Sequence, residues 1–587
     1  MVVVSAPATL RALEERGFDL GSQLVGTAAR SAQALAERPA YRVLAAAVAE
    51  DVAADRRRDA AAGIGMRYAH RQFNPAWLRS EKVRWELIAV VNRLDRRPFA
   101  PEHCGEIRFV YRLAYTENTA TGVVSSRLPM TLNLVRFQPR GGAPGGEPSG
   151  SEPRSGESRS GERTCRDVAR AWMGGSTASE DAAWLTAPGG PLEPRRVRTL
   201  PLKSVELNYQ SVRWPSTVRP RLGGHAEYGM RVFRPKSEAP YLEPAPLENT
   251  IDRARLAKDR SLREELRAWL SRPESLAALD AGTLVVPERF LADHAVSVAP
   301  HGLERKGNRP FAATFTPKDF ANLDFSGLTS VRSAASMIRR LDGLSCPGCH
   351  HSRSLAGFHL LGEDAPDKLV DALRVPMSPH FHTEVWRRRA YVAALASGRA
   401  VDEARPPAER APNDNGVGAH CGLGDPAYAT WTCAPGLRCT NTGDPEVGTC
   451  LPADGPSVGD ACEHGTITGS DAHHDTTKLA RVACQGERVC EQNSVGFPDG
   501  MCAGACTDLP EGAICGGIPL LTEFNGCLAR GRSFESCILE NTRPGALRAC
   551  SFHEPCRDDY ICARANGGGA CMPPYFLFQL RVDGHPI

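Results

Sequence analysis

The chain of 587 residues lacks long apolar runs and lacks an excess of either charge. No stretch approaches the roughly 18 consecutive apolar residues that read as a membrane-spanning helix. Its 71 lysines and arginines nearly balance its 68 aspartates and glutamates, which leaves a formal net charge of +3. We therefore expect no transmembrane segment and no nucleic-acid partner, because neither an apolar span nor a basic field is present.

Cysteine is scarce over most of the chain and dense at its end. Only Cys104, Cys165, Cys346 and Cys349 precede residue 421, and the other 16 of the 20 cysteines lie in 421–571. A dense, even set among Gly, Pro and Asp indicates a disulfide framework, which persists in oxidising compartments. We expect an extracytoplasmic protein, which would be periplasmic, cell-surface or secreted. The first residues contain no apolar leader, so the signal sequence is expected to be missing from this chain.

The spacing of cysteines in this tail repeats. The copies are Cys433-x5-Cys439-x10-Cys450, Cys484-x5-Cys490-x11-Cys502 and, more loosely, Cys556-x5-Cys562-x8-Cys571. Units of this size need disulfides in order to fold, and cysteine order alone does not give their pairing. The pattern predicts disulfide-rich repeats with little secondary structure. They would either bind a surface or matrix ligand or serve as a passive spacer.

Short runs of alternating or β-branched residues between Trp85 and Arg234 favour β-strands. The runs lie at 86–91, 106–113, 132–137, 205–209 and 228–233. Between two of them, 140–164 is dominated by Gly, Ser, Pro, Glu and Arg and is expected to be a disordered insertion. Cys104 and Cys165 bracket it, so a disulfide between them is expected; two buried free thiols are the alternative.

The changes of composition and pattern predict a multidomain α+β chain. We expect a helical lead-in (1–60), a β-rich domain (61–246), a helical connector (247–319), a small all-α module (320–400), a linker (401–420) and the Cys-rich repeats (421–587). The usual hydrolase, Walker and dinucleotide motifs do not occur in a supporting context, so no hydrolase or transferase activity is assigned. Asp95 and Glu106 lie near predicted strands, but nothing in the sequence brings these two carboxylates together.

The most informative motif is Cys346-Pro-Gly-Cys349-His350, a C-x-x-C-H run in a region otherwise poor in cysteine. This spacing allows two thiols to attach a haem while the adjacent imidazole binds its iron. Apolar residues recur at helical spacing on either side of the motif. Before it they are Val331, Ala334, Ala335, Ile338 and Leu341, and after it Val385, Trp386, Ala390, Tyr391, Ala393, Ala394 and Leu395.

A helix, a C-x-x-C-H motif, a loop and a closing helix over about 320–400 resemble the cytochrome c fold. The resemblance implies one haem c attached at Cys346 and Cys349, with His350 as the proximal ligand. It also implies a distal ligand further along, for which Met377 matches best and His359, His380 and His382 compete. In that family the first and last helices pack across one another beside the haem. The runs around Asn92-Arg93-Leu94-Asp95 and Cys104-Gly105-Glu106 also resemble an uncharacterised type of exported bacterial protein.

Two other interpretations of the motif stay open. Cys346, Cys349, His350 and His359 form a set that could bind one Zn²⁺, and Cys346 and Cys349 could instead form a disulfide. The resemblance favours an exported haem c-binding protein for electron transfer or redox sensing, with an unknown redox partner. The alternative is an extracellular surface or adhesion-type protein in which the C-x-x-C-H motif is a structural disulfide or zinc site.

Overall fold

The computed structural model describes most of the first 453 residues and a few short strands beyond them. The described residues are 2–61, 73–119, 122–140, 160–174, 181–213, 225–239, 241–299, 309–351, 379–407, 409–410, 415–416, 419–441, 445–453, 490–491, 501–502, 561–565 and 568–572.

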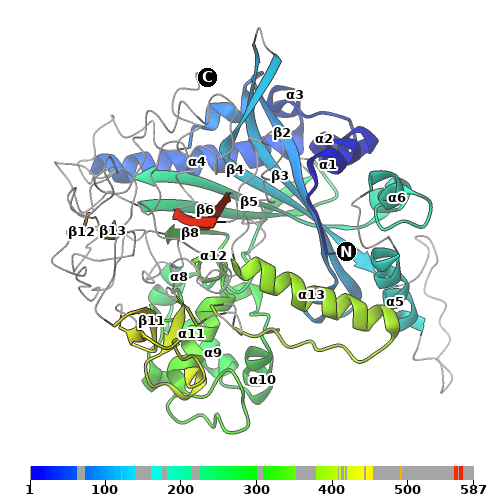
Figure 1. The fold of residues 1–587 in the computed structure, drawn as a ribbon. Helices are drawn as coiled ribbons and strands as arrows, with labels where there is room; N and C mark the ends of the chain where they lie inside the picture. Colours follow the sequence, from blue (N-terminus) through cyan, green and yellow to red (C-terminus); the bar gives the residue numbers. More distant parts are fainter. Residues whose placement is uncertain are drawn as a thin grey trace.

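A large antiparallel sheet forms the centre of the fold (Figure 1). Within the described residues it has eight strands in the order β1-β2-β3-β4-β5-β6-β7, with β8 also paired to β6. Their bounds are β1 Val3–Val4, β2 Val83–Arg93, β3 His103–Thr119, β4 Gly122–Pro139, β5 Leu202–Arg213, β6 His225–Pro235, β7 Leu242–Ala245 and β8 His294–Ala299. From β2 to β7 strands adjacent in sequence are adjacent in the sheet, as in hairpin-connected antiparallel sheets.

The five predicted strands are confirmed as the middle of this sheet, in β2 to β6. The β-branched and aromatic residues that predicted them are buried, as Val90, Phe109 and Leu134 illustrate with 0% exposure each. Residues on both faces of β2 are buried, including the successive residues Val90 and Val91. The sheet is therefore covered on both sides, and the chain is a mixed α+β protein.

Helices at both ends of the described chain share one large hydrophobic core with the sheet. The helices before the connector are α1 Pro7–Leu13, α2 Leu20–Val25, α3 Ala32–Ala36, α4 Pro39–Ala61, α5 Ser160–Met173, α6 Ala182–Thr186 and α7 Pro194–Thr199. Leu10, Phe18 and Tyr41 from the expected lead-in pack in this core, and β1 pairs with β2. Residues of the helical lead-in thus share the hydrophobic core of the β-rich unit.

The connector and the helix after it form a second, smaller hydrophobic core. Its helices are α8 Arg253–Lys258, α9 Arg260–Leu270, α10 Pro273–Ala281 and α11 Ala334–Leu344. Leu266, Leu279, Phe311 and Ile338 pack together there. The connector also supplies strand β8, which extends the large sheet beside β6. The described part of the connector is therefore not purely helical, because its strand β8 lies at the edge of the sheet.

The two helices predicted around the C-x-x-C-H motif exist, as α11 and α13 (Pro379–Ser397). Their packing differs from the expected arrangement. Ile338 and Leu341 of α11 lie in the smaller core, whereas Tyr391 and Leu395 of α13 lie in the large core. Figure 1 shows α13 running beside α5, away from α11. Among the described residues, 320–400 is therefore shared between two cores and does not pack as one all-α unit.

The expected Cys104–Cys165 disulfide is confirmed, with the two Cα atoms 5.2 Å apart. It joins β3 to α5, and α5 packs on α13. Most of the expected disordered insertion lies outside the described residues. Its last five residues form the first turns of α5, which begins at Ser160. Their glutamate and arginine favour a helix, and the disulfide fixes the turn that follows.

Short hairpins make up the described part of the tail. Their strands are β9 His420–Gly422, β10 Leu437–Thr440, β11 Val447–Pro452, β12 Cys490–Glu491, β13 Met501–Cys502, β14 Ile561–Ala565 and β15 Gly568–Met572. In each of the three repeats the second and third cysteines stand opposite one another. The pairs are Cys439 and Cys450, Cys490 and Cys502, and Cys562 and Cys571. The repeated spacing therefore corresponds to a repeated hairpin.

None of the helices in the described ranges combines the length and apolar character that a bilayer crossing needs.

Candidate functional site

The C-x-x-C-H motif forms its own short helix, α12 (Cys346–His351), directly after α11. Ser345 separates the two helices, and its hydroxyl accepts from the Gly348 N–H at 3.2 Å while donating to the Asp342 carbonyl at 2.7 Å. The N–H of Cys346 donates to Thr250 Oγ1 at 3.0 Å. These bonds satisfy amides that the start of a helix leaves without partners. The position of the motif is therefore fixed by the surrounding chain.

Glycine is required inside the motif. A Cβ atom at Gly348 would lie 2.0 Å from the carbonyl oxygen of Asp342, closer than any side chain can approach. Pro347 also contacts the sheet, because its carbonyl accepts from Ser297 Oγ of β8 at 3.3 Å. The close packing of α12 on α11 and β8 thus explains the residues between the two motif cysteines.

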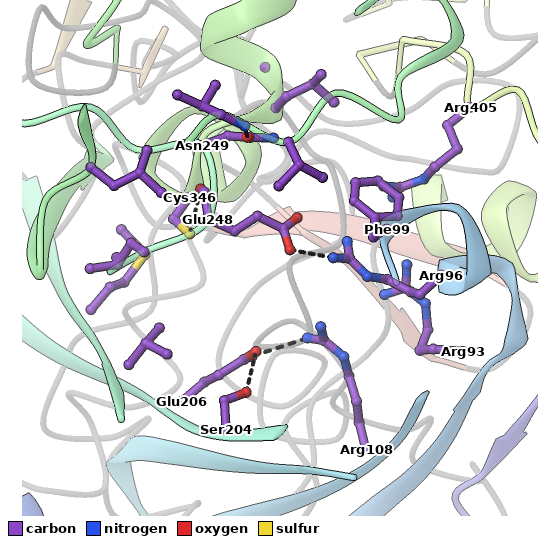
Figure 2. Close-up of a pocket in the computed structure, with 18 of the residues that line it drawn as sticks. Arg93, Arg96, Phe99, Arg108, Ser204, Glu206, Glu248, Asn249, Cys346 and Arg405 are labelled. Carbon is purple, nitrogen blue, oxygen red and sulfur yellow. Dashed lines mark hydrogen bonds and ion pairs between the residues drawn. The ribbon is translucent and has the colours of Figure 1, made fainter. Parts of the chain in front are cut away.

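Cys346 lines a cavity of about 860 Å³ between the large sheet, α11 and α13 (Figure 2). Its sulfur lies 3.5 Å from the carbonyl oxygen of Glu248. The apolar part of the lining includes Phe99, Phe137, Met230, Leu247, Leu344 and Trp431. The volume falls within the range of roughly 300–1,000 Å³ that is usual for cofactor and ligand pockets.

The structure describes the other predicted haem-binding residues only in part. Cys349 and His350 belong to α12, three and four positions after Cys346. Of the four candidates for the distal position, Met377 and His359 lie outside the described residues, whereas His380 and His382 belong to the first turn of α13. The structure thus assigns Cys346 to the cavity wall and leaves the choice of distal ligand open.

A first group of charged residues, the Glu106 cluster, lines and supports one side of the cavity. It consists of Glu106, Glu206, Glu248, Arg96, Arg108 and Lys203. Arg108 donates to Glu106 at 3.0 Å and to Glu206 at 3.1 Å. Lys203 also pairs with Glu106, and Arg96 pairs with Glu248. Three cations therefore face three carboxylates.

The pKa values in this cluster reflect its balance. Burial alone would raise the pKa of Glu106, but Lys203 and Arg96 outweigh burial and hold it well below its usual range. Burial would also raise the pKa of Glu248, but the positive charge of Arg96, followed by that of Lys203, lowers it to about 2. Burial alone would lower the pKa of Arg96, but Glu248 and Glu106 raise it instead. Every charge in this cluster is stabilised by an opposite one.

A second group, the Asp95 cluster, consists of Arg93, Asp95, Glu384, Arg387 and Arg388. Asp95 accepts from Arg93 Nε and from Arg387 Nη2, each at 2.9 Å. Glu384 of α13 accepts from Arg387 Nε at 2.8 Å and from Arg388 Nε at 3.0 Å. Three guanidiniums thus share two carboxylates. Arg388 Nη1 is buried and makes no hydrogen bond within the described residues.

Two further arginines, Arg340 and Arg405, extend the Asp95 cluster along the cavity wall. Arg340 donates to the backbone carbonyls of Leu279 and Arg405. The guanidinium of Arg405 lies 5.4 Å from the centre of the Phe99 ring, and its Nε is buried without a hydrogen bond. Neither guanidinium has a carboxylate within ion-pair distance in the described part of the chain. Figure 2 shows Arg405, Phe99 and Arg96 on the side of the cavity away from Cys346.

A cluster of cysteines in the tail also meets the distance requirement of a metal site. The sulfur atoms of Cys421, Cys433 and Cys439 lie within 4.8 Å of one another. They belong to two crossed disulfides, Cys421–Cys439 and Cys433–Cys450. Zinc binds thiolates, so these sulfurs could hold a metal only after reduction.

Comparisons of the chain with protein-family models, curated protein sequences and solved structures give no match. The function must therefore be argued from the residues of the site.

Sequence reasoning missed the charged walls of this cavity. Asp95 and Arg387 are 292 positions apart, and Arg405 lies in the segment expected to be only a linker. That segment is held in place, because the buried Glu409 accepts from Arg339 Nη2 at 2.6 Å. The one available signal is the run of three arginines from Arg387 to Arg389, which on an amphipathic helix favours a solvent-exposed face. Arg388 is instead 2% exposed.

Proposed function

We propose that this chain is an extracytoplasmic haem c-binding protein that transfers electrons or senses redox state. Cys346 and Cys349 would attach one haem, and His350 would bind its iron. The observation that supports the proposal most is the large cavity that begins at Cys346, the first residue of the motif helix. Only the attachment motif is carried over from cytochromes c, because α11 and α13 pack in different cores.

The residues around the cavity fit a haem c in three respects. The Cys346 sulfur lies at the wall, where an attachment residue must be. Apolar side chains such as Met230, Leu247 and Leu344 provide a surface for the flat macrocycle. The opposite side carries arginines, which bind carboxylates through paired N–H groups. A bound haem would supply one reversible electron-transfer centre.

The chain itself would position and tune this site. Ser345, Thr250 and Gly348 hold the motif helix in place through the hydrogen bonds and close contact described above. Arg388 and Arg405 would place positive charge near the cavity, which favours the more reduced state of any group bound there. The Cys104–Cys165 disulfide and the crossed disulfides of the first repeat support an oxidising location.

The proposal is tested with protein exported from a bacterial host that matures c-type haem. A haem-stained denaturing gel and a reduced α-band should identify wild-type protein as haem-bearing, because thioether bonds survive denaturation. The variant Cys346→Ala/Cys349→Ala should lose the stain. The matched control Cys104→Ala/Cys165→Ala, which removes two cysteines elsewhere, should keep it. Colourless wild-type protein from such a host would exclude the proposal.

The hairpin repeats favour a second candidate, an extracellular surface or adhesion-type protein. The first repeat is cross-linked by two interleaved disulfides, which suits a rigid module that meets a surface or matrix ligand. In that case Cys346 and Cys349 would be bridged or would bind zinc. Mass spectrometry of unreduced protein separates these states, since a disulfide removes two hydrogens and a haem adds its own mass.

A further inference from the structure

The charges on the cavity wall do not balance on the side of the Asp95 cluster. Arg93, Arg387 and Arg388 face the carboxylates of Asp95 and Glu384. Arg340 and Arg405 line the same wall and have no ion pair within the described residues. Five guanidiniums therefore face two carboxylates, a surplus of three positive charges. The neighbouring Glu106 cluster shows that this chain is able to balance buried charge.

Two guanidinium donors on this wall also make no hydrogen bond in the part of the chain that the structure describes. They are Arg388 Nη1 and Arg405 Nε, both buried. Arg388 as a whole is 2% exposed. Buried donors are almost always paired, since leaving one unpaired is unfavourable. A group that accepts from both and carries negative charge would remove the imbalance and satisfy these donors together.

The pKa values point the same way. Burial, followed by the nearby charge of Arg93, lowers the pKa of Arg388 to about 10. Burial, followed by the charge of Arg405, lowers the pKa of Arg340 to about 10. Burial and Arg93 likewise lower the pKa of Arg405. These three guanidiniums are thus less stable as cations here than in water, and a bound anion would reverse that effect.

We propose that this wall of the cavity is a binding site for a small molecule that carries two or more carboxylate or phosphate groups, held by Arg340, Arg388 and Arg405. Guanidiniums bind such oxyanions through paired N–H···O bonds. The surplus of three charges calls for a multiply charged ligand, and the cavity of about 860 Å³ is far larger than one phosphate ion needs. The anionic groups could belong to a free metabolite or to a bound cofactor.

The proposal is tested by thermal unfolding of the purified full chain with citrate and, separately, with inorganic pyrophosphate. Sodium chloride and acetate at equal ionic strength serve as references. Binding to the folded state should raise Tm with increasing citrate or pyrophosphate, beyond the change in the reference salts. Arg405→Gln should weaken binding by about tenfold, equivalent to about 1.4 kcal/mol, because one charged hydrogen-bond partner is lost. Arg405→Lys should recover part of it.

The matched control is Arg234→Gln. Arg234 lines the same cavity, but it is half-exposed and already pairs with Glu243 at 2.7 Å. This variant should bind citrate as wild type does. Equal Tm shifts in citrate and in the reference salts would overturn the proposal, and so would equal losses in the Arg405 and Arg234 variants.

The source of the anion is identified by repeating the titration in the variant Cys346→Ala/Cys349→Ala. If both proteins respond equally, the site takes a free ligand. If only this variant responds, carboxylates of an attached haem occupy the site in the wild type. Because the titration needs no haem, a protein that proves colourless can still confirm or exclude the anion site.

Discussion

The two charge clusters beside the cavity are built from the same residue types but differ in their balance. In the Glu106 cluster every cation has a carboxylate partner. In the Asp95 cluster, together with Arg340 and Arg405, the described cations exceed the described carboxylates. The first arrangement is what stability alone requires of buried charge. The second is not, and such departures are typical of binding and catalytic sites.

Position in the fold explains why the clusters differ. The Glu106 cluster is held mostly by β3 and β5, two strands of the rigid sheet. The Asp95 cluster joins the end of β2 to α13 and receives Arg340 from α11 and Arg405 from the segment after α13. It thus lies where the two hydrophobic cores meet, as binding sites between structural units often do.

Removing the central carboxylate of the balanced cluster should have the largest effect. Glu106→Gln removes the carboxylate that pairs with Lys203 in this buried cluster. It also removes one of the two carboxylate partners of Arg96 and one of the two partners of Arg108. Breaking a buried ion pair typically lowers the free energy of unfolding by about 3–5 kcal/mol, which urea denaturation will measure. The control Glu243→Gln breaks the half-exposed pair with Arg234 and should lower it by at most about 1 kcal/mol. Similar losses in both variants would show that the Glu106 cluster is not a stabilising unit.

Removing the Cys104–Cys165 disulfide should lower the free energy of unfolding, because this bridge connects the elements that carry the two clusters. The bridge ties β3, which carries Glu106, to α5, which packs on α13 with its three cluster residues. A crosslink over 61 residues stabilises the folded chain by about 4 kcal/mol in the chain-entropy model. Cys104→Ser/Cys165→Ser should therefore lower the free energy of unfolding by about that amount. A reductant should then destabilise the variant less than the wild type, and equal sensitivity would argue against the bridge.

Glu14 provides a third buried carboxyl group for comparison, with the opposite pKa shift. Burial, and then the charge of Glu86, raise its pKa to about 7, although Arg30 opposes them. The folded chain therefore binds this proton more tightly than the unfolded chain. Its stabilising effect is complete below about pH 4.5 and is lost as the pH rises towards 7, by up to about 3 kcal/mol.

Glu14→Gln should abolish that fall in stability, because an amide does not titrate. The measurement is the free energy of unfolding of both proteins between pH 4.5 and 8. The wild type should lose stability relative to the variant as the pH rises. A constant difference across this range would mean that Glu14 stays ionised when folded.

Glu384 should act in the opposite direction and in a lower pH window. Burial would raise its pKa, but Arg388 and Arg387 lower it to about 2. Its contribution is present above the unfolded value of about 4.5 and is lost as the pH falls towards 2, by at most about 3 kcal/mol. Acid denaturation of wild type should therefore steepen below pH 4.5, and Glu384→Gln should lose part of this dependence. An unchanged acid transition in the variant would contradict the assignment.

Removing a cation from the unbalanced cluster should have the smallest effect on stability. Arg405→Gln loses the contact with Phe99, which for a cation beside a ring stabilises by about 0.5–2 kcal/mol. It also relieves repulsion from Arg93, which offsets much of that loss. We expect a net change of about 1 kcal/mol or less in the absence of added anions. A loss as large as that of Glu106→Gln would mean that Arg405 has a structural partner and is not surplus.

Local patterns in the sequence predicted local structure well. The β-branched runs gave β2 to β6, and the helical spacing of Val331 to Leu341 gave α11. The Cys104–Cys165 bridge followed from the small number of cysteines available before the tail. Long-range arrangement could not be predicted in this way. The pattern of α11 and α13 defined one apolar face on each helix, but nothing local determined which core each face would join.

The charged site was the least predictable part. Asp95 and Glu106 were noticed only as isolated carboxylates, because their partners lie on other elements far along the chain. The sequence gives each of these residues no periodicity or spacing that marks it as buried. Only folding brings Arg340, Arg388 and Arg405 to one wall. The C-x-x-C-H motif differs, since its chemistry depends on five adjacent residues and can be recognised without a fold.

The most direct test of the account is the mass of the proteolytic peptide that contains Cys346 and Cys349, released without reduction from protein exported by a haem c-maturing host. The proposed function predicts a peptide heavier by one haem, with absorbance that follows the peptide through chromatography. A peptide of unmodified mass, or one lighter by the two hydrogens of a Cys346–Cys349 disulfide, would contradict it.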